Sequence, residues 1–132
     1  MSIISGGIVE ITGDRQAGKT QRLVDAAFLD ASGRGRRVLF VTCHREVCDA
    51  LDRLLSWGGY ERAVRANGQQ RVTYASGGEV VFRSTRQGGR GHVVDTLIVD
   101  EVPVGATTTS ADLLACLNGR PDPRVYVARQ AL

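Results

Sequence analysis

The segment that most constrains this 132-residue chain is Gly13–Thr20, which reads GDRQAGKT. It matches the phosphate-binding pattern G-x-x-x-x-G-K-[ST] at every constrained position. The preceding residues 7–12 are apolar and β-branched, as in a buried strand, and residues 21–29 have helical spacing. A strand, a glycine-rich loop and a helix in this order form the context that the pattern requires. The sequence therefore predicts an α/β fold that binds phosphate.

Each type of residue in this loop can bind one part of a nucleoside triphosphate such as ATP with its Mg²⁺. Glycines allow backbone N–H groups to surround the phosphate oxygens, and the start of a helix adds positive potential. Lys19 is the only lysine in the chain, and we expect it to reach the β- and γ-phosphates, while Thr20 offers a hydroxyl to Mg²⁺. The alternative is a glycine turn that caps a helix and holds an incidental lysine. The expected nucleotide-binding residues are Gly13, Asp14, Arg15, Gln16, Ala17, Gly18, Lys19, Thr20 and Gln21.

A second candidate element is an apolar strand that ends in two carboxylates, Asp100 and Glu101. In enzymes with this phosphate loop, an aspartate so placed supports Mg²⁺. A glutamate that follows it can act as general base on the attacking water. Alone, the pattern fits any strand that enters a polar turn. Together with the upstream loop, it makes Asp100 a candidate metal-binding residue and Glu101 a candidate catalytic residue, and it favours water as the phosphoryl acceptor.

Strand and helix signals alternate along the chain and predict a single domain over residues 1–132. Nearly continuous apolar strands that alternate with helices indicate a parallel sheet covered on both faces, which is a three-layer α/β/α fold. A β-hairpin is expected where a glycine-containing turn separates two short strands. The predicted strands are 7–12, 37–42, 71–74, 79–82, 94–99 and 124–128, and the predicted helices reach Ala31 and span 44–57 and 110–117.

Two further groups of polar residues are candidates for function. The last strand ends in Arg129 and Gln130, which either sense the γ-phosphate or belong to a solvated chain end. The first reading assumes that this strand inserts beside the phosphate-loop strand, since ligands lie at the carboxyl ends of parallel strands. Arg83, Arg86 and Arg90 lie in a glycine-rich loop. This loop either contacts nucleic acid or a neighbouring subunit, or is simply solvated.

Composition bears on the partners, the use of the cysteines and the cellular location of the protein. The net charge of +3 and pI of about 9.1 are compatible with a nucleic-acid partner without being evidence for one. Three cysteines without a C-x-x-C pair argue against a disulfide framework or a zinc site, and we expect Cys48 and Cys116 to be small core residues. No apolar run approaches the length of a membrane span. We therefore expect a cytoplasmic protein.

In three segments the chain resembles the ATPase domain of phage terminase large subunits, the motors that package DNA. The loop Arg15-Gln16-Ala17-Gly18-Lys19-Thr20 is similar to their arginine-containing loop, and Glu79–Ser84 to the strand that precedes an arginine–glycine pair. Arg90-Gly91 followed by Val94–Glu101 is similar to their run into the Asp-Glu strand. The chain also resembles one RecA-like domain of superfamily helicases.

This resemblance implies a P-loop NTPase with a mainly parallel sheet, with Walker A and Walker B elements, Mg²⁺-dependent ATP hydrolysis and Arg15 as an arginine finger in cis. DNA, a homo-oligomer or a larger motor are the implied partners, and no nuclease domain is expected within these residues. A surface arginine in a flexible loop is the alternative for Arg15. Rival functions are a nucleotide-binding regulatory module with little turnover and a small P-loop kinase.

Overall fold

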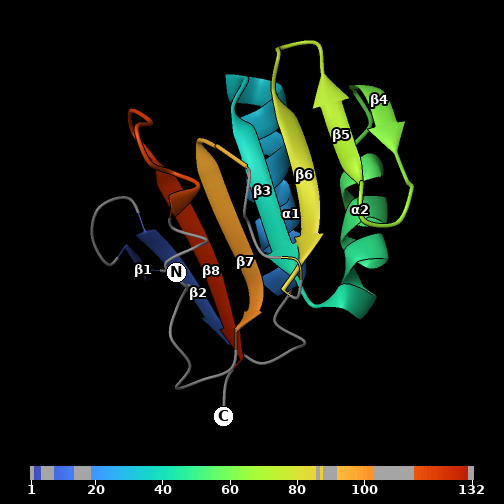
Figure 1. Cartoon of the computed structure of the whole chain (residues 1–132). Coiled ribbons are helices and arrows are strands. Elements are labelled where there is room, and N and C mark those ends of the chain that lie inside the picture. Colours follow the sequence, from blue (N-terminus) through green and yellow to red (C-terminus); the bar gives the residue numbers. More distant parts are fainter. Residues whose placement is uncertain are drawn as a thin grey trace.

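An eight-stranded sheet in the order β1-β2-β8-β7-β3-β6-β5-β4 forms the centre of the computed structural model (Figure 1). The structure describes residues 2–3, 8–13, 19–85, 87, 92–102 and 115–130. Within these ranges, no helix has the length and apolar content that crossing a bilayer requires. The strands are β1 Ser2–Ile3, β2 Ile8–Gly13, β3 Arg37–Thr42, β4 Tyr60–Val64, β5 Arg71–Tyr74, β6 Glu79–Ser84, β7 Thr96–Val102 and β8 Arg124–Gln130. The helical segments are α1 Lys19–Phe28, the π-helical turn η2 Leu29–Gly33, the 3₁₀ turn η3 His44–Glu46 and α2 Val47–Leu55.

Strands β2, β8, β7, β3 and β6 run parallel, so their carboxyl ends meet at one edge of the sheet. The last strand, β8, inserts between β2 and β7, as expected from the sequence. The expected hairpin is also present, since β5 and β6 pair antiparallel with Thr73 opposite Glu79. The fold class predicted from the sequence is confirmed as α/β with a mainly parallel sheet.

Two strands were not predicted from the sequence. β4 pairs antiparallel with β5 at one edge of the sheet, and the short β1 pairs with β2 at the other. β4 has charged residues at Glu61 and Arg62 and leaves its first three residues exposed, so it lacks the apolar run that marks the central strands. Its pairing with β5, rather than burial of its own side chains, makes it a strand.

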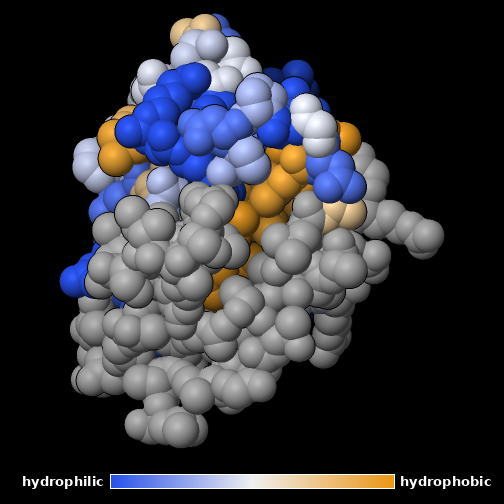
Figure 2. Space-filling model, turned by 90° about the vertical axis from the view of Figure 1, so that its left-hand side faces the viewer, coloured by the Kyte–Doolittle hydropathy of each residue, from blue (hydrophilic) through white to orange (hydrophobic). Residues whose placement is uncertain are grey.

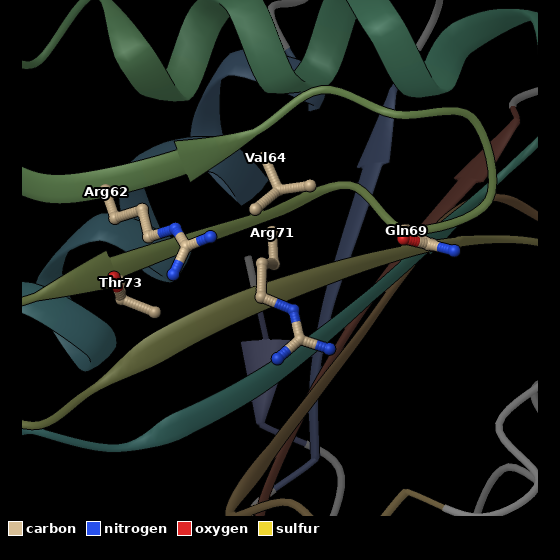
Figure 3. A pocket seen from close by; sticks show the side chains of 5 residues that line it. All are labelled: Arg62, Val64, Gln69, Arg71 and Thr73. Atoms are coloured by element: carbon tan, nitrogen blue, oxygen red, sulfur yellow. The ribbon is translucent and has the colours of Figure 1, made fainter.

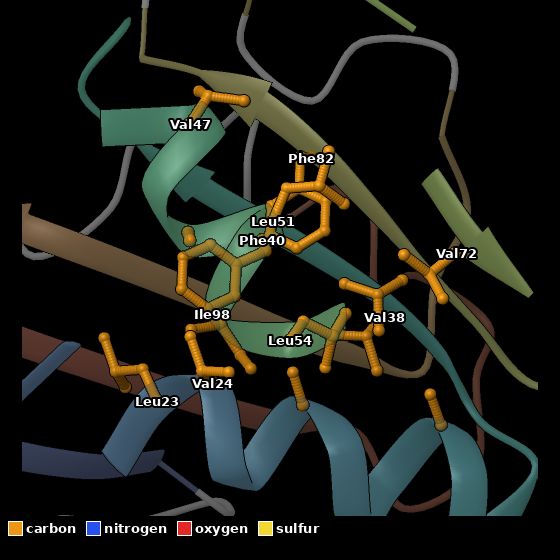
Figure 4. Packing of buried hydrophobic residues seen from close by; sticks show 14 of the residues in the cluster. Leu23, Val24, Val38, Phe40, Val47, Leu51, Leu54, Val72, Phe82 and Ile98 are labelled. Atoms are coloured by element: carbon orange, nitrogen blue, oxygen red, sulfur yellow. The ribbon is translucent and has the colours of Figure 1, made fainter. Parts of the chain in front are cut away.

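The helices that the structure describes lie on one face of the sheet (Figure 1). Figure 4 shows Phe40 and Phe82 from the sheet packed with Leu51 and Leu54 from α2, while Leu23 and Val24 approach from α1. The rings of Phe40 and Phe82 have their centroids 5.3 Å apart. Burial of these side chains contributes about 1.5–3 kcal/mol each, so this cluster holds α1 and α2 against the sheet.

The opposite face is covered over β3, β7 and β8 by two connecting segments. Val94 and Cys116 pack there with Leu39, Leu97 and Val127 in a second buried cluster. The Val94 N–H donates to the Cys116 carbonyl at 2.8 Å, which joins the two segments. The helix predicted at 110–117 lies largely outside the described residues.

The expectation that two cysteines are core residues is confirmed for Cys116 and wrong for Cys48, which is exposed. α2 buries Val47, Ala50, Leu51 and Leu54 on one side, and Cys48 lies on another. Helical geometry therefore places this thiol at the surface.

Buried Asp30 organises the amino-terminal ends of the parallel strands. Its Oδ2 accepts a hydrogen bond from the Thr96 hydroxyl at 2.8 Å, and its Oδ1 accepts one from Arg34 at 2.5 Å. Arg36 and Arg124 lie 3.8 and 3.7 Å from its carboxylate oxygens. Figure 2 shows hydrophilic residues gathered at this end of the molecule. A fully buried carboxylate is stable here because cations and a hydroxyl surround it.

The turn of the β5–β6 hairpin packs closely on η2. The Ser76 hydroxyl donates to the Ala31 carbonyl at 2.7 Å, and the Gly78 N–H donates to Ser76 Oγ at 3.3 Å. A Cβ atom at position 78 would lie 2.7 Å from the carbonyl carbon of Ala31 and closer still to its oxygen. Only glycine allows this approach of two backbones.

We predict that Gly78→Ala lowers the free energy of unfolding by about 1–3 kcal/mol or more, because overpacking against backbone cannot relax by a rotamer change. Gly33→Ala is the matched control, since a Cβ atom there meets nothing within 4 Å and φ is not positive. Urea unfolding followed by circular dichroism measures both variants. Equal stability of the two would contradict the packing described for Gly78.

Candidate nucleotide site

The candidate site lies where α1 begins and β7 approaches its end. The Thr20 hydroxyl donates to Asp100 Oδ2 at 3.0 Å, although the two residues are 80 positions apart in the sequence. Lys19, the residue before Thr20, is 6% exposed, and Asp100 is 2% exposed. The structure thus brings together three of the residues that the sequence marked for phosphate and metal binding.

This pair of oxygen ligands fits Mg²⁺. The ion prefers hard oxygen donors, and it commonly takes only one or two protein groups beside phosphate oxygens and water. A hydroxyl and a carboxylate in direct contact provide such groups. No cluster of three or more His, Cys, Asp or Glu side chains that could hold a metal ion occurs in the described part of the chain.

Several predicted residues lie in or beside the loop. Gly13 ends β2. Residues 14–18, which include Arg15, lie outside the described residues. Gln21 donates to Asp25 Oδ1 at 2.8 Å and accepts from Arg53 of α2 at 3.1 Å. Its side chain therefore helps to join α1 and α2, and a role for Gln21 toward nucleotide would rest on its backbone N–H.

For Glu101 and the end of β8, the structure gives the positions of the backbone. Glu101 directly follows Asp100 within β7, so the backbone of the candidate general base adjoins that of the candidate metal ligand. Arg129 pairs in register with Thr12, and Gln130 with Gly13. The end of β8 is therefore adjacent to the start of the phosphate loop, as a sensor role would require.

Arg83 lies on the sheet face opposite Thr20 and Asp100. Along β6, Val81 belongs to the second buried cluster, and Arg83 is two residues further on, so the two share a face. The sheet therefore separates Arg83 from the Thr20–Asp100 pair. Arg86 and Arg90 lie outside the described residues.

A basic sheet face over β4 and β5 was not predicted from the sequence. Figure 3 shows its side chains, with Arg62 from β4 and Arg71 from β5. These two arginines line a hollow of about 460 Å³ together with Val64, Gln69 and Thr73. Arg62 and Arg71 are exposed. The sequence did not predict that Arg62 and Arg71 share one face, because residues 60–64 lack the apolar run that would have indicated β4.

The charge of this face is only partly balanced. Glu79 accepts from Arg37 at 2.6 Å and lies 4.0 Å from Arg71. Burial lowers the pKa of nearby His92, and repulsion from Arg83, Arg37 and Arg71 lowers it further, although Glu79 acts in the opposite direction. The three arginines thus act on the His92 pKa in the same direction, as like charges near an imidazolium do.

We predict that Thr20→Val lowers the free energy of unfolding by about 1–3 kcal/mol, because it removes a hydroxyl donor from a buried carboxylate. Thr20→Ser keeps the donor and should remain within about 0.5 kcal/mol of the wild type. Urea titration without nucleotide measures both. A stable Thr20→Val variant would mean that the bond to Asp100 contributes nothing to folding.

Comparison with known proteins gives matches in structure only. No protein-family model matches the chain, and no curated protein matches it by sequence. The large terminase from a thermophilic bacteriophage superimposes with a TM-score of 0.66 at 20% identity, over 94% of this chain and 32% of that one. For the HK97 bacteriophage large terminase the TM-score is 0.71 at 10% identity, over 94% and 29%. For the ATPase domain of the Thermus phage P74-26 large terminase it is 0.67 at 18% identity, over 93% and 58%.

At sequence identities of 10–20%, these superpositions establish the fold of this chain and nothing further. The chain spans about a third of the first two proteins and just over half of the terminase ATPase domain. The sequence resemblance that rested on the loop and the Asp-Glu strand is confirmed at the level of structure. Nearly all of the chain has the fold of phage large-terminase ATPase domains.

Proposed function

We propose that this domain binds ATP with Mg²⁺ and hydrolyses it. The observation that carries the proposal is the hydrogen bond from Thr20 to Asp100, which unites the two sequence elements expected to hold Mg²⁺. The position of β8 beside the start of the phosphate loop supports it, because this arrangement places a third strand end at the same site. The fold shared with terminase ATPase domains is consistent with this function.

Each residue has a separate task in the proposed reaction. Lys19 and the loop amides bind the phosphates, while Thr20 and Asp100 hold Mg²⁺. Bound Mg²⁺ would neutralise charge on the phosphate oxygens. Glu101 accepts a proton from the attacking water, and Arg15 stabilises the charge that develops on the transferred phosphoryl group. Arg129 or Gln130 contacts the γ-phosphate from the end of β8.

We further propose DNA as the macromolecular partner and a larger motor or a homo-oligomer as the setting, in the host cytoplasm if the protein is phage-encoded. This step is an analogy from fold, supported by the basic face over β4 and β5. A regulatory module without turnover and a small kinase are the competing functions.

We predict that the wild-type protein hydrolyses ATP with Mg²⁺ and that Glu101→Gln lowers the rate by about 10²–10⁴-fold while it leaves ATP binding intact. Phosphate release, with and without DNA, and equilibrium binding of a fluorescent ATP analogue measure the two properties. Binding without turnover in the wild type under all conditions would favour the regulatory module. Transfer of the phosphoryl group to a small acceptor would favour a kinase.

We predict that the double variant Arg62→Ala/Arg71→Ala binds DNA more weakly. A plot of the logarithm of the association constant against the logarithm of the salt concentration should become less steep by about 2, because two phosphate contacts are lost. Arg53→Ala/Arg65→Ala is the control with equal charge change, since these arginines pair with Asp49 and Asp52 of α2 at 2.8 Å. Fluorescence anisotropy with a labelled duplex at several salt concentrations distinguishes the pairs. Equal losses for both would indicate a general charge effect and exclude this face as the contact.

A further inference from the structure

Thr42, at the carboxyl end of β3, has a hydroxyl whose burial the fold itself does not explain. The residue is 0% exposed, and its Oγ1 is among the buried side-chain atoms of the described residues that have no hydrogen-bond partner. A buried unpaired hydroxyl costs free energy relative to an apolar group of the same shape. Valine has that shape, and valine already occupies positions 38 and 41 of the same strand. Folding alone would therefore favour valine at position 42.

The sheet register places Thr42 beside the candidate site. β3 lies between β7 and β6, and Val41 pairs with Val99, so Thr42 and Asp100 each lie one residue beyond this pair on neighbouring strands. Val38 and Phe40 of β3 and Ile98 of β7 belong to the cluster under α1 and α2. Strand alternation then puts Thr42 and Asp100 on that same face. This is also the face on which Thr20 reaches Asp100.

The neighbour on the other side of Thr42 already has partners. Ser84 of β6 pairs in register with Thr42. Its Oγ accepts from the Gln87 N–H at 3.3 Å, and its own N–H donates to Gln87 Oε1 at 2.9 Å. A carboxylate has about four acceptor sites, so the Asp100 carboxylate is the group on this row of the sheet with the largest capacity to accept a further hydrogen bond.

We propose that Thr42 is a positioning residue for Asp100. In the nucleotide-bound state the Thr42 hydroxyl donates a hydrogen bond to the Asp100 carboxylate and orients it toward Mg²⁺. Partners of this kind around a metal ligand fix its direction and contribute about 10–100-fold to metal affinity or activity. The inference rests on the proposed Mg²⁺–ATP site, and it gives the hydroxyl of Thr42 a task that a valine at this position could not perform.

The test compares Thr42→Val with Thr96→Val. Both substitutions exchange a fully buried threonine on the same sheet face, but the Thr96 hydroxyl donates to Asp30 at 2.8 Å and accepts from Arg36 at 2.9 Å. Without nucleotide, Thr42→Val should keep or raise the melting temperature, whereas Thr96→Val should lower it. With ATP analogue, Thr42→Val should raise the Mg²⁺ concentration at half-maximal binding by about tenfold and lower kcat by a similar factor, with KM little changed. Thr42→Ser should restore both.

Each outcome supports the proposal or overturns it. A loss of stability in nucleotide-free Thr42→Val would overturn it, because the hydroxyl would then have its partner in the resting fold. An unchanged Mg²⁺ midpoint and kcat in Thr42→Val, with a Mg²⁺-dependent wild type, would overturn this inference alone. If wild-type binding of the ATP analogue does not depend on Mg²⁺, the proposed function fails and this inference fails with it.

Discussion

Parallel pairing of β2, β8, β7 and β3 is the constraint on which the rest of this structure depends. Parallel strands have all their carboxyl ends at one edge, so the end of β2 at Gly13 and the carboxyl ends of β8 and β7 lie at the same edge of the sheet. The hydrogen bond from Thr20 to Asp100 closes this edge by joining the start of α1 to β7. The sheet itself therefore positions the candidate site before any ligand is present.

The two ends of the sheet use polar groups differently. At the amino-terminal end, buried Asp30 is satisfied by Thr96 and by nearby arginines, and these contacts serve the fold. At the carboxyl end, Asp100 is buried on the strand next to Thr42, whose hydroxyl lacks a partner among the described residues. An incompletely satisfied buried polar group is unfavourable for folding alone. Its presence at the ligand end of the sheet agrees with a site that is completed by what it binds.

The central elements could be predicted because their signals are local. Residues 38–41 form an uninterrupted apolar run, and β3 spans it with one further residue at each end, Arg37 and Thr42. The turn at 75–78 contains two glycines, and it joins β5 to β6. β4 could not be predicted, since an edge strand with exposed charges has no apolar pattern of its own. Cys48 was misplaced although the apolar spacing of Val47, Leu51 and Leu54 already indicates the buried side of α2, because Cys48 lies outside that side.

By itself, the sequence determined which chemical groups this chain carries and in what order they stand. The order of a buried strand, the Gly13–Thr20 loop and a helix, followed by a strand that ends in Asp100 and Glu101, is local information, because backbone conformation and hydrophobic periodicity depend on neighbouring residues. Tertiary structure decided which of these groups meet. Only strand order and register bring Thr20 to Asp100, set Thr42 beside them, and place Arg83 on the opposite face with the basic surface of Arg62 and Arg71. Such contacts join residues far apart in the chain, and their geometry follows from pairing across the sheet, which no local pattern encodes.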